Sequence, residues 1–295
     1  MLARLLGCVP GVCSVGEVVN LWRQGLLENE RCGCGETFRR CPFWGQVGAV
    51  AFGGWHVVDA KRILALKSFL DRNAPLLAAP RPPSAVHRRL EEYHGFYLRL
   101  YAAVAQVSGC AVIVDASKHG SLALCLRHCG DLDLRVLHMV RDSRGVAYSW
   151  TKRVTRPEAA RGDSFMDRFS PVHAAMLWNA YNLGFEFLAR LRVPTLLVRY
   201  EDLVRSPASM LRQVAAFAGM PGDDETPSFL HGGNAELAAT HLVAGNPMRF
   251  DTGRLALRED DAWRSQFPAQ QRAVVWALTL PLLLRYGYVG RGGKP

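Results

Sequence analysis

The 295-residue sequence predicts an α/β protein in which helices flank an open parallel sheet. Three short apolar runs rich in β-branched residues are typical of buried parallel strands, at 111–114, 134–140 and 194–198. Helical segments separate them, and strands that alternate with helices imply a parallel sheet covered on both faces. Ligands of such sheets bind beyond the carboxyl ends of the strands, so the residues directly after each strand are the first candidates for a site.

Helical periodicity fills much of the remaining sequence. A cap at Ser206 followed by Pro207 starts one helix, and Gly219 ends it. The Pro-rich stretch 79–84 is short, which favours a turn between two helices over a linker, so we expect one domain spanning 1–295. The other expected helices cover residues 60–77, 85–107, 122–128 and 171–191.

The composition, with 21% charged and 49% apolar residues, is that of an ordinary soluble protein. The apolar run closest to a membrane span, 274–284, is interrupted by Thr279 and Pro281 and predicts a buried helix. The first residues lack the features of a secretory signal, so we expect a cytoplasmic location. The net charge of +10 favours an anionic partner. Since no long Lys/Arg cluster occurs, we expect a small polyphosphorylated ligand and no nucleic acid.

Three of the eight cysteines, Cys32, Cys34 and Cys41, lie close together in the segment CGCGETFRRCPFW. They could supply three ligands of a zinc site, but no fourth ligand lies nearby in the sequence. The alternative is a reduced, partly buried loop, because disulfides are uncommon in a chain without a secretory signal. We expect no metal.

The segment after the second predicted strand reads RDSRGVAYSW and predicts a site for a phosphate group. A helix should begin near Ser143, where free backbone N–H groups attract anions, and Arg141 offers a bidentate guanidinium. Ser149 lies eight residues after Arg141, so it can share a helix face with it and with Arg153 one turn further. The alternative is that Arg141 and Asp142 pair with each other and cap the helix.

Charged residues also follow the other two predicted strands. DASKHG follows the first, where Lys118 could neutralise a developing oxyanion and His119 could act as a general base. The alternatives are an exposed lysine and a histidine at the edge of the next helix. RYEDL (199–203) follows the third strand, and its acidic residues should cap a turn. A cofactor contact from its first two residues is the alternative.

In this order, the segments resemble the superfamily of sulfotransferases that use 3′-phosphoadenosine-5′-phosphosulfate (PAPS). HMVRDSRGVAYSW resembles the family's 3′-phosphate motif, in which a Ser follows the Arg of an Arg-Asp pair by eight residues. LLVRYEDLVRSP, the VDASK strand end and GNPMRF (245–250) extend the resemblance, and PGVCSVGE and CGCG…CPFW resemble a bacterial branch related to carbohydrate and tyrosylprotein sulfotransferases. The resemblance implies a P-loop-like fold and transfer of a sulfonyl group from PAPS to a hydroxyl or amine of a small molecule, a sugar or a lipid.

The resemblance also implies roles for individual residues. Arg141 and Ser149 should bind the 3′-phosphate, with Arg153 and Arg249 as further candidates. Lys118 resembles the lysine that contacts the transferring sulfonate.

Two residues are candidates for the general base. Glu17 falls at the short strand after the first helix, where tyrosylprotein and trehalose sulfotransferases place a catalytic carboxylate, and it is the first choice. His119 is the second. The alternative for Glu17 is a carboxylate at a helix start that faces solvent.

The sequence departs from the superfamily at its beginning. Family members begin with a strand and a Gly/Ser/Thr-rich loop that wraps the 5′-phosphosulfate, whereas MLARLLGCVPG resembles the helix that follows. We therefore expect this strand and loop to be missing, either because Met1 is an internal residue of a longer natural protein or because the chain is a repurposed relative. Transfer should then be absent or weak. The alternative function is a non-catalytic 3′-phosphoadenosine nucleotide-binding protein; a P-loop kinase is disfavoured because G-x-x-x-x-G-K-[ST] does not occur.

Overall fold

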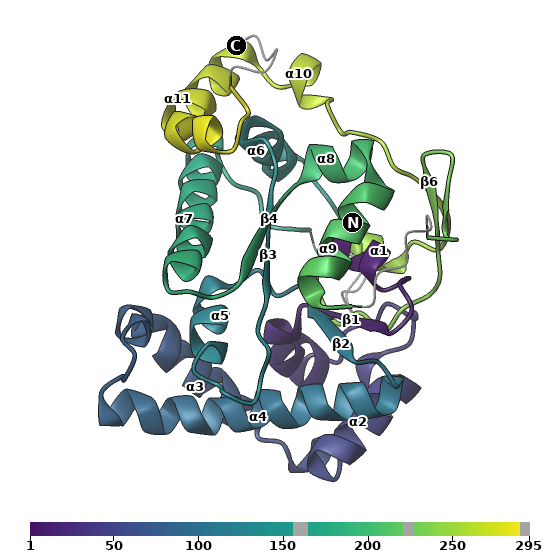
Figure 1. Ribbon diagram of the computed structural model, residues 1–295, viewed down its shortest axis with the longest axis vertical. Helices are drawn as coiled ribbons and strands as arrows, with labels where there is room; N and C mark the ends of the chain where they lie inside the picture. Colours follow the sequence, from purple (N-terminus) through teal and green to yellow (C-terminus); the bar gives the residue numbers. More distant parts are fainter. Residues whose placement is uncertain (156–164, 221–226, 290–295) are drawn as a thin grey trace. The chain divides into compact units, whose positions relative to one another are not determined.

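Figure 1 shows the computed structural model, which describes residues 1–155, 165–220 and 227–289. The chain divides into two compact units, and each contains a pair of parallel strands. The expectation of a single domain stays a prediction. The described part of the first unit comprises residues 1–135, 215–220 and 227–256, and that of the second comprises residues 136–155, 165–214 and 257–289.

The parallel strands of the first unit are β1 (Val12–Gly16) and β2 (Val112–Asp115). α1 (Leu2–Leu6) leads into β1. The strand expected at 111–114 is therefore β2, displaced by one residue, so that it ends on an aspartate.

The long helix α4 (Ser84–Ser108) packs against this strand pair (Figure 1). It ends at Gly109, whose φ of 68° is a conformation that glycine adopts without strain. Its apolar side chains recur every three or four residues and are buried, as a core-facing helix requires: Leu90, Tyr93, Tyr97, Leu100 and Val104. This unit also contains the α-helices α2 (Pro42–Phe52), α3 (Ala60–Arg72) and α5 (Gly120–Leu126) and a π-helix over Leu21–Leu27. A 3₁₀ helix over Ala74–Ala78 ends the segment expected to be helical over 60–77.

A three-stranded antiparallel sheet completes the first unit, formed by β5 (Leu230–His231), β6 (Asn234–Leu237) and β7 (Gly253–Ala256). The sequence did not predict it. Its strands have two to four residues and lack a run of β-branched side chains, so their pattern is too short to distinguish from a loop.

The second unit contains the parallel pair β3 (Val136–Val140) and β4 (Thr195–Arg199), which correspond to the two remaining predicted strands. α7 (Pro171–Arg190) begins at Ser170, whose hydroxyl accepts the His173 N–H at 3.2 Å, and packs beside β3. The other helices are α6 (Ser143–Thr151), α8 (Tyr200–Arg205), α9 (Pro207–Ala218), which begins in this unit, α10 (Trp263–Gln266) and α11 (Ala269–Arg285).

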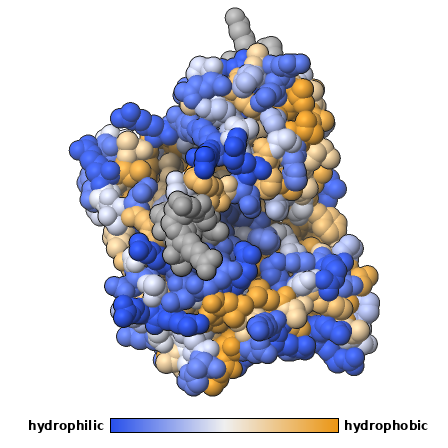
Figure 2. All heavy atoms as spheres, turned by 180° about the vertical axis from the view of Figure 1, so that it is seen from behind, coloured by the Kyte–Doolittle hydropathy of each residue, from blue (hydrophilic) through white to orange (hydrophobic). Residues whose placement is uncertain are grey.

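The apolar run 274–284 forms part of α11, but only one face of this helix is buried. Val275 and Leu283 are fully covered, whereas Val274 and Leu284 are 40% and 55% exposed. The prediction of a buried helix is therefore corrected, because α11 is amphipathic. Apolar side chains reach the surface elsewhere too, and Figure 2 shows them in patches among hydrophilic ones. In the part of the chain that the structure describes, every helix is too short or too polar to cross a membrane.

The α/β class is confirmed, because short parallel strands alternate with helices along the chain. Each predicted strand is found within two residues of its expected bounds. The parallel pairing occurs as two two-stranded sheets.

Candidate functional site

The strand ends of β1 and β2 bring a carboxylate and an ammonium group together. Glu17 directly follows β1, and Lys118 lies in the turn after β2. The Lys118 Nζ is 2.5 Å from the Glu17 Oε1. The Glu17 side chain is only 13% exposed, whereas that of Lys118 is 69% exposed. The acid is therefore fixed and sheltered, and the cation reaches it from solvent.

A buried hydrogen-bond network centred on Asp115 holds both turns in place. Its carboxylate accepts the backbone N–H groups of Val18 at 3.3 Å and Ser117 at 2.9 Å, and the Tyr101 hydroxyl at 2.7 Å. The Ser117 hydroxyl donates to the same carboxylate and accepts the Val19 N–H at 3.0 Å. Burial raises the pKa of Asp115, and these hydrogen bonds partly oppose the rise. Asp115 thus joins the turn of Glu17 to the turn of Lys118.

The carboxylate of Glu17 is also oriented by its neighbours. The Asn20 Nδ2 donates to Oε2 at 3.0 Å, and the backbone N–H of Glu17 donates to the Val243 carbonyl at 2.8 Å. Gly245 passes so close that a Cβ there would lie 2.9 Å from Oε1. The GNPMRF segment therefore forms one wall around Glu17, and its glycine is required for the close approach. The alternative of a solvent-facing carboxylate does not fit this shielding.

Lys118 has a left-handed backbone, with φ of 58°. A residue with a Cβ adopts this conformation at a cost of about 1 kcal/mol or more, and such strain is often found at functional sites. The hydrogen bonds between Asp115 and Ser117 fix the turn directly before Lys118.

His119 occupies the position before the first residue of α5. Burial lowers its pKa, and the positive charge of Lys67 lowers it further. The ring is therefore neutral near pH 7 and could accept a proton. Glu17 adds a smaller, opposing contribution to its pKa. Both candidate bases thus belong to the same group of residues in the first unit.

In the second unit, Arg141 directly follows β3 and is held by a carboxylate. Its Nη2 donates to the Asp260 carbonyl at 2.7 Å and to the Asp260 Oδ2 at 3.0 Å. The guanidinium lies over the Tyr200 ring, 4.7 Å from its centroid, and the side chain is 21% exposed. Burial raises the pKa of Asp260, but the hydrogen bond and charge of Arg141 outweigh this and the net shift is downward.

Asp142 caps α6, as the sequence suggested, but its ionic partner is Arg144. Its carboxylate accepts the Arg144 backbone N–H at 2.9 Å and the guanidinium at 3.0 and 2.8 Å. The pairing of Arg141 with Asp142 that we considered is therefore wrong. The Asp142 N–H donates to the Glu201 Oε1 at 3.2 Å, and the Tyr288 hydroxyl donates to Oε2 at 2.6 Å. Glu201 of the RYEDL segment is thus a buried support for this turn.

The sulfotransferase domain family model matches residues 87–231, which include Lys118, Arg141 and Ser149. This match and the relatives below support the sulfotransferase superfamily. Carbohydrate sulfotransferase 3 from Mus musculus is 26% identical over 168 residues, and that from Homo sapiens is 28% identical over 178 residues. These alignments cover 53% of this chain and 34% of each relative, so the chain spans about a third of the length of the curated relatives it matches.

Two solved structures are also similar to the chain. The Sulfotransferase Domain from the Synechococcus PCC 7002 Olefin Synthase has a TM-score of 0.42 and 19% identity, and the match covers 92% of each chain. The Sulfotransferase Domain from the Curacin Biosynthetic Pathway has a TM-score of 0.40 and 14% identity over 93% of this chain and 98% of the other.

The remaining residues that the superfamily motifs single out have different surroundings. Ser149 lies in the last turn of α6 and is exposed, and Arg153 follows the helix with its guanidinium 3.8 Å from the centroid of the Phe165 ring. Arg249 is only 2% exposed, and its Nη1 donates to the Gly245 carbonyl at 2.6 Å. Arg249 thus supports the GNPMRF turn, and a phosphate contact from it stays a prediction.

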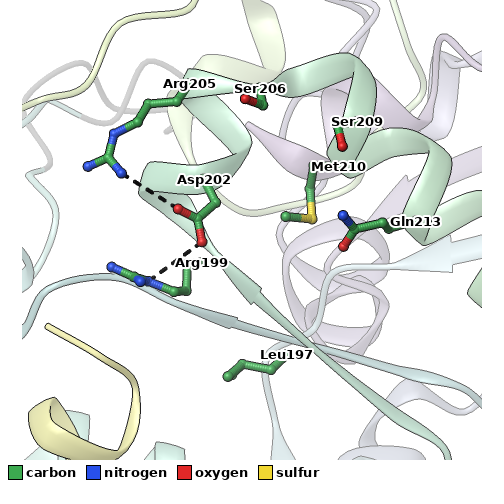
Figure 3. A pocket seen from close by; sticks show the side chains of 8 residues that line it. All are labelled: Leu197, Arg199, Asp202, Arg205, Ser206, Ser209, Met210 and Gln213. Atoms are coloured by element: carbon green, nitrogen blue, oxygen red, sulfur yellow. Dashed lines mark ion pairs between the residues drawn. The ribbon is translucent and has the colours of Figure 1, made fainter. Parts of the chain in front are cut away.

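A pocket of about 340 Å³ lies beside β4, α8 and α9 (Figure 3). Its charges compensate one another: Asp202 is 3.7 Å from the Arg199 Nε and 3.6 Å from the Arg205 Nη1. Both guanidinium groups of this pocket therefore face a carboxylate, as Arg141 does in its own turn. Its lining residues are Leu197, Arg199, Asp202, Arg205, Ser206, Ser209, Met210 and Gln213.

The cysteine segment has a partner that the sequence analysis missed. Cys32, Cys34 and Cys41 come together with His241, and the four potential ligand atoms all lie within 4.8 Å of one another. The fourth potential ligand is distant in the sequence but close in space, because His241 is 200 residues away from Cys41 and the fold brings the two together. Local spacing contains no signal for such a pair.

Proposed function

We propose that this chain transfers a sulfonyl group from PAPS to a hydroxyl group of a carbohydrate. The observation that carries the proposal is the 2.5 Å contact between the Lys118 Nζ and the Glu17 Oε1 at the ends of two paired parallel strands. Sulfonyl transfer to an alcohol needs a base for the alcohol proton and a cation for the negative charge on the transferring group. This pair supplies both.

Glu17 is the base in this proposal. It removes the proton of the acceptor hydroxyl while the acceptor oxygen forms a bond to sulfur. The bond between sulfur and the bridging phosphate oxygen breaks, and 3′-phosphoadenosine-5′-phosphate (PAP) leaves with that oxygen. The hydrogen bond from Asn20 to Oε2 fixes the carboxylate plane and leaves Oε1 as the atom that accepts the proton.

Lys118 contacts the sulfonate and stabilises its negative charge. By doing so it leaves the Glu17 carboxylate, which can then act as the base. The Lys118 side chain is 69% exposed, so in this proposal its ammonium group can turn from Glu17 to the sulfonate. Once Lys118 turns to the sulfonate, the Glu17 Oε1 is free to accept the proton. The supporting network of Asp115 keeps both turns in register during this exchange.

Arg141 and Ser149 bind the 3′-phosphate. Arg141 donates to Asp260 through a single nitrogen, so the rest of its guanidinium remains available for a phosphate oxygen. Ser149 adds a hydroxyl on the exposed side of α6. Arg153, after the same helix, is a secondary contact.

The carbohydrate acceptor is supported by the similarity to the mouse and human proteins, which are carbohydrate sulfotransferases. The weak or absent transfer expected from the sequence stays a prediction, so nucleotide binding is the first test. The full chain is titrated with PAP and with adenosine 5′-phosphate, which lacks the 3′-phosphate. We expect PAP to bind more tightly, and Arg141→Ala to weaken PAP binding by about 10-fold or more while leaving adenosine 5′-phosphate unaffected.

Arg212→Ala is the matched control, because Arg212 is an exposed arginine on α9 outside the proposed site. Equal binding of the two nucleotides by the unaltered chain would rule out the 3′-phosphate site. Transfer from [³⁵S]PAPS to carbohydrate acceptors then separates an enzyme from a binding protein. Glu17→Gln should reduce transfer and keep PAP affinity, whereas PAP binding without any transfer by the unaltered chain favours the non-catalytic alternative.

A further inference from the structure

Cys32, Cys34, Cys41 and His241 form a closed cluster of four ligand atoms in the first unit. The Cys41 Sγ lies 3.7 Å from the sulfur atoms of both Cys32 and Cys34. The His241 Nδ1 lies 3.2 Å from the Cys41 Sγ and 3.9 Å from the Cys32 Sγ. A point between these atoms is therefore surrounded by three thiols and one imidazole.

These separations are those of a tetrahedral zinc site. With Zn–S bonds of about 2.3 Å and Zn–N bonds of about 2.0 Å, tetrahedral geometry places sulfur atoms about 3.8 Å apart and sulfur about 3.5 Å from nitrogen. A disulfide would need about 2.05 Å between two sulfur atoms, and the cysteines are free. The cluster fits a metal ion better than it fits a cross-link.

We propose that Cys32, Cys34, Cys41 and His241 bind one Zn²⁺ ion with a structural role. Four protein ligands complete the tetrahedron, so the ion would have no open position for a substrate or water. This assignment replaces our expectation of no metal, and it stands independently of the proposed sulfonyl transfer.

Two of the three thiols are shielded from solvent, because Cys32 and Cys41 are each only 1% exposed. Cys41 directly precedes α2, and the amino-terminal end of a helix favours a thiolate.

Two contacts orient the imidazole of His241. The ring of His241 stacks on that of Phe43, with centroids 4.9 Å apart and planes at 9°. The Trp44 indole N–H donates to the backbone carbonyl of His241 at 2.9 Å. Both supports come from the start of α2, directly after Cys41, so one short segment positions a thiol and the distant histidine.

The two chain segments that carry the ligands also touch through their backbones. Gly33 donates its N–H to the Leu242 carbonyl at 3.0 Å, and a Cβ on Gly33 would lie 2.7 Å from the Thr240 carbonyl oxygen. Zn²⁺ would therefore fasten a contact that closes a loop of about two hundred residues, for which the entropy of closure is large. The fastened segment continues to Val243 and Gly245, which contact the Glu17 turn.

Metal content of the purified full chain is the direct test. We expect about one zinc per chain by mass spectrometry after exhaustive dialysis, and loss of the metal from Cys41→Ser and from His241→Ala. Cys110→Ser and His231→Ala are matched controls outside the cluster, and both should keep the zinc. Zinc-free protein that also fails to take up zinc after reduction would overturn the proposal.

Cobalt substitution tests the ligand set in protein that has folded normally. Co²⁺ added to the reduced, metal-depleted chain should give the visible bands of a tetrahedral site together with thiolate-to-metal charge transfer. Cys34→Ser removes the most exposed of the three thiols, so it should fold and retain Co²⁺ with altered bands and an affinity on the order of 100-fold lower. A spectrum without charge transfer, or one identical in Cys34→Ser, would exclude this coordination.

Discussion

The turn after β2 and the turn after β3 both place a cation beside an aspartate, but they use these residues differently. After β2, Asp115 binds backbone N–H groups and its neighbour Lys118 remains 69% exposed. After β3, Asp142 binds Arg144, both side chains are 7% exposed, and Arg141 is held by Asp260. The first turn presents an exposed cation on a hydrogen-bonded backbone, and the second presents a cation held by a carboxylate. An exposed ammonium can change its partner during a reaction, whereas a held guanidinium suits a group that only binds a ligand.

The largest effect should come from removing the buried acid of the second turn. Asp142→Ala leaves the Arg144 guanidinium buried without its carboxylate and removes the cap of α6. We expect a loss of about 3–5 kcal/mol in the free energy of unfolding, measured by urea denaturation. Asp133→Ala is the control, since the Asp133 side chain is 72% exposed in its pair with Arg135, and it should change stability by less than about 1 kcal/mol. Similar losses in both variants would mean that the second turn is not held by its ion pair.

The corresponding change in the first turn should cost less, because the partners of Asp115 among the described residues are hydrogen-bond donors without a formal charge. Asp115→Ala leaves the Val18 and Ser117 N–H groups without their acceptor, which should cost about 2–3 kcal/mol. Both turns of the candidate site should loosen as well. Sulfonyl transfer would then fall while PAP affinity stays constant, and an equal loss of PAP affinity would contradict the separation of the two roles.

Because Lys118 has a left-handed backbone, its glycine and alanine variants should differ in stability. Both Lys118→Gly and Lys118→Ala remove the ammonium group, so both should lose transfer activity. Only glycine relieves the strained φ, and Lys118→Gly should be the more stable of the two by about 1 kcal/mol in thermal unfolding. At Arg212, on an ordinary helix, the order should reverse, with alanine the more stable by about 0.5–1 kcal/mol. The same order at both positions would show that Lys118 is not strained.

The sequence predicted the places where the two turns occur but not the contacts that hold them. Buried strands and helix starts have local patterns, so β2, β3, β4 and the start of α6 were found close to their observed bounds. The partners Asp260, His241 and Gly245 lie at least 100 residues from the groups they contact, and no local pattern points to them. Asp115 was detectable, because a carboxylate that ends an apolar strand must find donors when it is buried. The roles of Glu17, Lys118, Arg141 and Ser149 in catalysis and binding stay predictions.

The smallest effect concerns His119, the second candidate for the base. Burial lowers the pKa of its imidazole in the folded chain below that in the unfolded chain, so its contribution to stability is present above about pH 6.5 and is lost as the pH falls. His119→Gln should therefore reduce the loss of stability between about pH 7.5 and 5.5 by less than about 1 kcal/mol, measured by urea unfolding at each pH. If Glu17 is the base, transfer by His119→Gln keeps the rate and pH profile of the unaltered chain. A loss of transfer in His119→Gln at unchanged stability would instead assign proton removal to the imidazole and leave Glu17 as the partner that orients Lys118.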